Sequence, residues 1–383
     1  MNPPPDELYR NERYKFDSKA LEEAEFADHV ARVRNVQQRL ARQFFAGVPN
    51  RVFHAKMHAC LLGSLTLRPD RPAAVRRGLF ADGGKTRFNV LARFSNGVGR
   101  QDHDLKPDVR GVALKIFGVS DPAATAPSGA TRCVDWLMTN SPNPFGRDQE
   151  EFVEFMEANG GGALELPVYL ARHPEVAALL LKAAARVIPS LATERYWSGH
   201  AYLLGDDIAM KFNVAPPPDA PAAGIANDHA EAGRLDSLVQ RAIQGAGTIE
   251  DRLARWFAQH TPESSPLHAD YLRRDLLHRL AAAPVRYTLS VQLEKSTDAT
   301  PVENTLLEWT EADSRSVPVA DLVLDRESTA IDNESLRFTP AHFIAAHRPL
   351  GNLARGRLFT YSASQEGRGA VTSDPGENAL FRS

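Results

Sequence analysis

The sequence has few cysteines, no long apolar run and no local signature of the common hydrolase sites. Cys60 and Cys133 are the only cysteines in 383 residues, which excludes a disulfide framework and a cysteine-rich zinc set. There is no CxxC and no GxSxG motif. No apolar run approaches the ~20 residues of a membrane span. The first 17 residues are polar, so no secretory signal is expected and a reducing cytoplasm is the predicted location.

Charge is nearly balanced along the chain. The formal net charge is −3, which gives no support for a nucleic-acid partner. Hydrophobic residues make up 43% and charged residues 24%, as in ordinary globular proteins. The length suits one large domain or two smaller ones, each with a sizeable core.

Short β-rich runs separated by turn signals recur along the chain. They span residues 58–69, 87–99, 109–119, 133–140, 285–295 and 319–325, with a hairpin over 201–215. Helical patterns cover 26–46, 148–159 and much of 227–283, while 1–25 is an arm, 120–131 a loop and 215–224 a linker. Closely spaced strands of this kind predict an eight-stranded antiparallel β-barrel with helical insertions, an α+β fold.

One candidate site lies near the C-terminus, in RGRLFTYSASQEGR over residues 355–368. Arg357 precedes Tyr361 by four residues, so the two share a face if the segment is helical. A guanidinium beside a phenol favours the ionised phenolate, and an Fe(III) ion would use that phenolate as a ligand. A salt-bridged arginine beside a core tyrosine is the commoner arrangement when this spacing stands alone.

Other candidates lie in the first half of the chain. His54 and His58 are four residues apart and could form half of a metal site, but Ala55 stands where a metalloprotease helix has glutamate. A structural histidine is the commoner alternative. Alternation places Arg93 and Ser95 on one face of a strand, within reach of a histidine on a neighbouring strand. Asn140 ends another strand, where it could donate into a pocket or cap a turn.

Taken in chain order, these segments resemble the haem catalase family. RVFHAK resembles the segment of the distal histidine, ARFSNG the arginine–phenylalanine–serine strand, TNSPNPFGRD the segment of the distal asparagine, and GRLFTY that of the axial tyrosine. The resemblance runs from about residue 51 to 368. It implies an arm and helix over 1–46, a haem-binding barrel domain over 47–368 and a tail over 369–383.

The resemblance also implies roles for individual residues. Tyr361 is the expected axial ligand of the iron of haem b, as tyrosine is in catalases, and Arg357 holds it as phenolate. His54 and Asn140 are the expected distal groups that move a proton and polarise the peroxide, with Ser95 fixing the tautomer of His54. Three arginines are expected to pair with the haem propionates: Arg51, Arg93 and Arg368.

The function implied is that of a small catalase-related peroxidase. Such an enzyme reduces hydrogen peroxide or organic hydroperoxides through a ferryl intermediate, with an organic reductant as second substrate. Phe53 stands where the family has valine before the distal histidine, and Gln365 and Glu366 replace histidines. These departures leave two alternatives open: a fatty-acid hydroperoxide isomerase or lyase on the same scaffold, and a non-enzymatic haem-binding protein. The family also implies a homo-oligomer, a dimer or a tetramer.

Overall fold

The structure is a computed structural model that describes residues 7–104, 106, 108–119, 133–162, 164–184, 188–218, 269–329, 331–370 and 377–381. The predicted loop over 120–131 and most of the predicted helical region over 227–283 lie outside the described residues, as does the end of the predicted linker. Within the described part of the chain, every helix is too short or too polar to cross a lipid bilayer.

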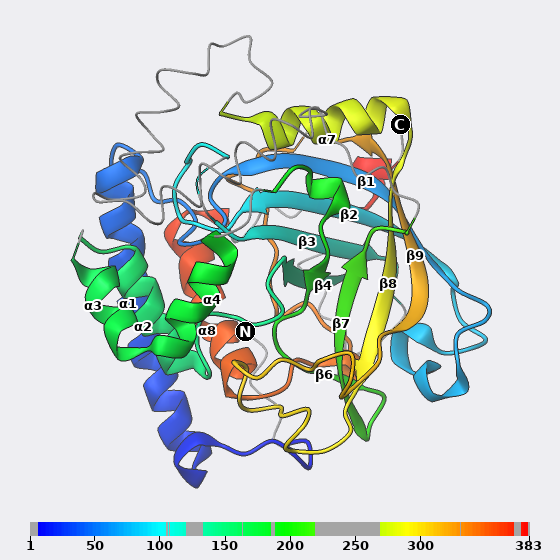
Figure 1. Cartoon of the computed structure of the whole chain (residues 1–383), viewed down its shortest axis with the longest axis horizontal. Helices are drawn as coiled ribbons and strands as arrows, with labels where there is room; N and C mark the ends of the chain where they lie inside the picture. The colour runs from blue at the N-terminus through cyan, green and yellow to red at the C-terminus, as the bar shows by residue number, and fades with distance from the viewer. Residues whose placement is uncertain are drawn as a thin grey trace.

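A closed antiparallel barrel of eight strands forms the centre of the molecule, as predicted (Figure 1). Around the barrel the order is β5-β4-β3-β2-β1-β9-β8-β7, and β7 pairs with β5 to close the ring. The extra strand β6 (Tyr202–Leu204) pairs with β7. The eight strands are β1 Met57–Leu67, β2 Arg87–Asn96, β3 Arg110–Phe117, β4 Cys133–Thr139, β5 Tyr196–Trp197, β7 Ile208–Ala215, β8 Val285–Leu293 and β9 Val317–Glu327.

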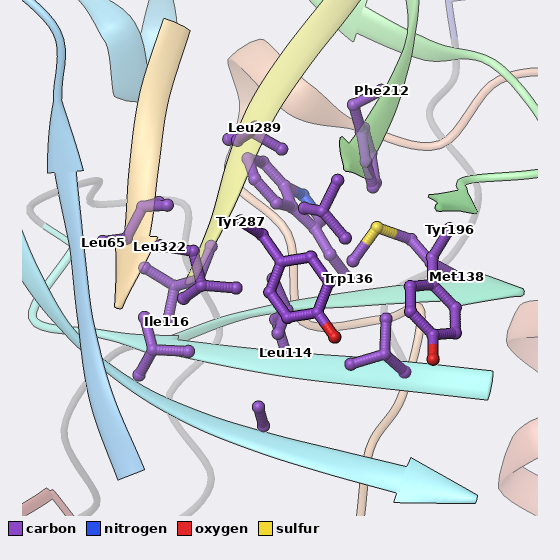
Figure 2. Close-up of a cluster of buried hydrophobic side chains, with 14 of the residues drawn as sticks. Leu65, Leu114, Ile116, Trp136, Met138, Tyr196, Phe212, Tyr287, Leu289 and Leu322 are labelled. Atoms are coloured by element: carbon purple, nitrogen blue, oxygen red, sulfur yellow. The ribbon is translucent and has the colours of Figure 1, made fainter. Parts of the chain in front are cut away.

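The barrel interior is filled by apolar side chains that alternate along each strand. Trp136 lies near the middle of this core, with its ring 4.5 Å from that of Phe212, and Tyr196 and Tyr287 lie beside it (Figure 2). On β2, Phe94 is one of the residues that point into the barrel. The residues on either side of it therefore face outward, because successive side chains of a strand point to opposite faces.

Helices cover one side and one end of the barrel (Figure 1). On the side lie α1 (Lys19–Phe44), α2 (Gln149–Asn159), α3 (Glu165–Arg172), α4 (Pro174–Ala184) and α8 (Asn352–Gly367), and α7 (Tyr271–Ala282) crosses the end near β1 and β9. The short α9 spans Glu377–Phe381, and single 3₁₀ turns span Lys15–Asp17, Ala73–Val75, Gly78–Phe80, Leu191–Thr193 and Ala345–His347. The segment that holds Tyr361 thus packs outside the barrel, as predicted.

The first helix begins earlier than its hydrophobic pattern indicates. We predicted a helix over 26–46 preceded by an arm, but α1 begins at Lys19 because the Ser18 hydroxyl accepts a hydrogen bond from the backbone of Leu21, at 3.3 Å. The described part of the arm before α1 packs against the rest of the same chain. Glu12 of the arm pairs with Arg355 at the start of α8 at 2.8 Å. Both residues are buried, as is Glu22 of α1.

Candidate functional site

His54 lies in the loop before β1 with its backbone in the left-handed region, at φ 60°. This conformation is costly for a residue with a Cβ and persists only where the surroundings enforce it. The His54 N–H donates to Gly97 O at 2.8 Å, and Arg93 donates from Nη2 to His54 O at 2.8 Å. The backbone of His54 is therefore clamped on both sides by residues of β2 and the turn after it.

The imidazole of His54 is held through one nitrogen. Nδ1 lies 2.8 Å from the Asn96 carbonyl and 3.1 Å from the Ser95 hydroxyl. A carbonyl oxygen only accepts, so Nδ1 carries the proton and Nε2 is left with its lone pair. The structure thus brings Ser95 to His54, as the alternation on β2 predicted, and adds the Asn96 carbonyl as the closer partner.

His54 is neutral over the physiological pH range. Burial, together with the positive charges of Arg93, Arg357 and Arg51, lowers its pKa to about 4. A neutral imidazole with a free Nε2 is a proton acceptor, which is the state a general base needs. Among these charges, that of Arg357 comes from α8.

The outer faces of β2 and β3 form the wall behind His54. Ser95 pairs with Gly111 across the two strands, and a Cβ added at Gly111 would lie 2.6 Å from the His54 ring. Only glycine leaves room for the imidazole here. At Gly111 the wall therefore leaves space for the ring of His54.

Helix α8 carries the arginine–tyrosine pair. Arg357 donates from Nη2 to the Tyr361 oxygen at 2.8 Å, and its guanidinium carbon lies 4.9 Å from the centre of the same ring. Burial opposes the charge of Arg357, but Tyr361 and Tyr202 beside it raise its pKa on balance. A charged donor held on a phenol oxygen favours the phenolate form of that phenol.

The other three predicted arginines form a cluster at one edge of the site. Arg51 and Arg368 both donate to Leu336 O, at 2.6 and 3.0 Å, and Arg93 donates to the Asn333 side chain at 3.0 and 2.9 Å. Burial lowers the pKa of Arg93 well below its usual value, and the neighbouring charges of Arg51 and Arg368 add to this effect. The three guanidiniums repel one another in a buried place.

Two carboxylates act on this cluster among the described residues: that of Glu334, at 3.7 Å from Arg51, and that of Asp332, whose charge also acts on Arg51. Arg51 Nη1 is buried and has no hydrogen-bond partner in the described part of the chain. Buried charges are normally paired, and the cluster has more guanidiniums than carboxylates. The propionates of a haem would supply further negative charge, and the phenol oxygen of Tyr361 is the donor that ferric haem takes in catalases. The residues present therefore fit the cofactor.

Asn140 lies at the end of β4 beside β3. Its Oδ1 accepts from the Arg110 N–H at 2.7 Å and its Nδ2 donates to Glu194 at 3.0 Å. Both ends of the carboxamide are thus engaged with the protein. The peroxide-polarising role that the resemblance gives to Asn140 would use the second N–H of Nδ2, since a carboxamide nitrogen has two donors.

Phe53, which precedes His54, packs away from the strands. Its ring lies 5.7 Å from that of Phe152 and 6.0 Å from that of Phe155, both on α2. The larger side chain at this position therefore ties the His54 loop to α2.

Sequence reasoning missed the groups that hold the predicted residues in place. Asn333 and Glu334 anchor the arginine cluster from a loop between β9 and α8, and nothing in the local sequence distinguishes that loop. Asn96 follows Ser95 directly, but strand alternation drew attention to side chains, whereas Asn96 contacts His54 through its backbone carbonyl. A search for backbone acceptors next to predicted catalytic side chains would have found it.

Comparison with known proteins gives a consistent result. No family model matches the sequence. The chain is 28% identical over 217 residues to a catalase-related peroxidase of Mycolicibacterium paratuberculosis, a match that covers 55% of this chain and 56% of that protein. The chain thus matches about half the length of this curated relative.

Two solved catalase structures share the fold. A fungal catalase gives a TM-score of 0.62 at 18% sequence identity, covering 84% of this chain and 60% of the other. A bacterial catalase gives 0.60 at 19% identity, covering 84% and 58%. The resemblance to the haem catalase family that the motifs indicated is therefore confirmed, and the chain has the catalase-like fold.

Proposed function

We propose that the chain is a haem-dependent peroxide-consuming oxidoreductase, a catalase-related peroxidase that acts on hydrogen peroxide or organic hydroperoxides. The observation that carries this proposal is the combination of Tyr361, with Arg357 on its oxygen, and a neutral His54 whose Nδ1 carries the proton and whose pKa the charge of Arg357 helps to lower. The similarity to a catalase-related peroxidase supports the same reaction class.

Haem b would be held by two sets of residues. Tyr361 would bind the iron, with Arg357 keeping its oxygen ionised, and the arginines at positions 51, 93 and 368 would bind the propionates. Bound there, the haem would supply the redox centre for the reduction of peroxide. Every other part of the reaction falls to side chains of the chain.

The distal side chains would manage the proton. His54 Nε2 would take the proton from the inner oxygen of the bound peroxide and return it to the outer oxygen, which then leaves as water or as an alcohol. Ser95 and Asn96 hold Nδ1, so the ring can present only Nε2 to the substrate. Asn140 would orient the outer peroxide oxygen with the second N–H of Nδ2, while the first stays on Glu194.

Two substitutions test the proposal. Tyr361→Phe removes the oxygen that would bind iron, so we expect loss of stable ferric haem, measured from the absorption spectrum after reconstitution. His54→Ala leaves the proximal side intact and removes the base, so haem should bind while the reaction with peroxide slows about 10²- to 10⁴-fold. Stopped-flow mixing with hydrogen peroxide and with cumene hydroperoxide measures that rate.

The same experiment separates the alternatives. Full activity in His54→Ala would refute the distal role, and a wild-type chain that stays colourless after reconstitution would refute the proposal as a whole. Conversion of a hydroperoxy fatty acid without any electron donor would favour the isomerase or lyase. Haem binding with no reaction toward either peroxide would favour the non-enzymatic alternative.

A further inference from the structure

His58, which the sequence offered as half of a metal site, has a different place in the structure. Its side chain is 0% exposed, and Nε2 lies 2.7 Å from Asn96 Oδ1. Nδ1 has no hydrogen-bond partner among the described residues and lies 3.8 Å from a carboxylate oxygen of Asp104. Both histidines of the predicted pair are thus attached to one residue, Asn96, which itself is buried.

Asn96 connects the two rings through different atoms. Its backbone carbonyl accepts from His54 Nδ1, and its side-chain oxygen accepts from His58 Nε2. Its Nδ2 points to Asp104 at 3.4 Å, and its backbone N–H donates to Lys56 O at 3.0 Å. The carbonyl that orients His54 is therefore held by the pairing of Asn96 with Arg110 on β3, by the backbone contact with Lys56 and by the side-chain contacts of Asn96.

A β-bulge places His58 where its ring reaches the Asn96 side chain. The register between β1 and β2 shifts between Met57 and Ala59, so His58 is the extra residue of β1. Bulges redirect one side chain without ending a strand and are frequent beside active sites. Without the shift, regular alternation would not bring His58 to the Asn96 side chain.

Asp104, which lies beside Asn96 and His58, is held by groups of other elements. Asp104 accepts from Lys56 Nζ at 2.7 Å and from the backbone of Leu272 on α7 at 3.0 Å. Asn96 Nδ2 points to Asp104, so Asn96 Oδ1 is the atom that faces His58, and His58 donates from Nε2 both as the neutral Nε2–H tautomer and as the charged imidazole. The link to His54 thus rests on a rigid, buried set of contacts.

We infer that His58 is a positioning residue for His54: by donating to the Asn96 side chain, it fixes the carbonyl that sets the tautomer of His54. This inference rests on the proposed function only in that it gives His54 its role as base. Its structural part concerns the protonation of two imidazoles and applies to the chain with or without haem.

The first test is ¹⁵N NMR of the histidine ring nitrogens in the full-length chain. In the wild type we expect His54 protonated at Nδ1 and His58 protonated at Nε2. In His58→Leu we expect signals from both tautomers of His54, and in His58→Gln, whose amide can donate to Asn96, a return to the Nδ1–H form. His347→Gln is the matched control, because His347 is equally buried but contacts Leu79 and Leu203 instead.

The second test uses the haem-loaded enzyme. His58→Leu should lower kcat about 10- to 100-fold with little change in KM, since a small displacement of a catalytic group has effects of this size. His58→Gln should recover most of this loss, and His347→Gln should leave kcat within about twofold.

Two results would overturn the inference. One is a folded His58→Leu chain in which His54 keeps a single Nδ1–H tautomer. The other is a wild-type His58 protonated at Nδ1 alone, which needs no variant and so decides the matter even if His58→Leu fails to fold. A chain that binds no haem would refute the proposed function and leave the tautomer result standing.

Discussion

The two faces of β2 and β3 are both largely buried, but only the outer face carries a polar site beside its apolar side chains, which include Leu91 and Phe117. The inner face is apolar and contributes residues such as Phe94 and Leu114 to the packed core around Trp136 (Figure 2). The outer face carries Arg93, Ser95 and Gly111, whose neighbours are a strained histidine and other arginines. A strand has the same backbone on both sides, so the difference lies wholly in the side chains.

The contrast separates side chains that stabilise the fold from side chains that serve the candidate site. Burying apolar surface stabilises the fold by roughly 25 cal/mol per Å², and the inner face does only this. On the outer face, burial of Arg93 beside like charges opposes folding, as the lowered pKa of Arg93 shows. An arrangement that disfavours the folded chain alone is expected where a ligand of opposite charge belongs.

Truncation of the inner face should have the largest effect on stability. Trp136→Ala leaves a large cavity among Phe212, Phe80 and their neighbours, so we expect the free energy of unfolding to fall by about 3–5 kcal/mol. Urea denaturation followed by circular dichroism measures this. Leu137→Ala, at a partly buried residue on the opposite face of β4, is the comparison and should cost clearly less.

The Trp136 ring itself offers a sharper variant. Its Nε1–H is buried and has no hydrogen-bond partner in the described part of the chain. Trp136→Phe removes that N–H together with some volume, so its cost should be much smaller than that of the alanine variant. Equal losses in the two variants would show that the core tolerates cavities and that close packing of the inner face is not what stabilises the barrel.

Removal of one charge from the outer face should have an intermediate effect, and its sign should differ between the stability of the ligand-free chain and the affinity for haem. In Arg93→Gln the ligand-free chain should be as stable as the wild type or more stable, because one of three repelling charges is gone. Haem should bind more weakly by about 1.5–3 kcal/mol, the size of a hydrogen bond to a charged group. Urea denaturation without haem and haem titration measure the two quantities.

Arg71 provides the control for this variant. It is also buried, but it pairs with Asp82 at 2.9 Å and donates to the carbonyl groups of Phe80 and Arg68 at 2.8 and 2.7 Å. Arg71→Gln should therefore destabilise the ligand-free chain and leave haem affinity unchanged. If Arg93→Gln behaves in the same way, the arginine cluster is structural and does not bind propionates.

Most of the fold was predictable because the barrel strands have strong local signals. Turn residues and apolar runs placed most strands within a few residues of their ends, since alternation and turn chemistry act locally. The start of α1 was wrong because a single capping hydroxyl, that of Ser18, outweighed the hydrophobic pattern. In the site, the sequence pointed to Arg357 and Tyr361 because their spacing is itself the contact, at 2.8 Å.

The supports of the site were not predictable for a physical reason. Asn333 reaches Arg93 across 240 positions of sequence, and Asn96 holds His54 through a backbone atom that every residue possesses. Neither contact leaves a pattern of residue types in the sequence. The role of His58 was also hidden, because it depends on a bulge that shifts the register by one residue. Such contacts follow only from the folded chain.

The smallest effect on stability is expected from an added methyl group on the outer face. In Gly111→Ala the new Cβ would meet the His54 ring at 2.6 Å, and a ring at the end of a side chain can move aside. The free energy of unfolding should change by less than about 1 kcal/mol, while peroxide turnover falls about 10- to 100-fold because the base is displaced. Denaturation and steady-state kinetics measure the two.

Gly63 on β1 is the matched glycine for this comparison. A Cβ there would meet the backbone of β9, including the Leu324 Cα at 2.7 Å, and a paired backbone cannot move aside as a ring can. Gly63→Ala should therefore lower stability more than Gly111→Ala does. If Gly111→Ala unfolds the chain as readily, the outer face is packed as tightly as the inner face, and the distinction between a folding face and a functional face fails.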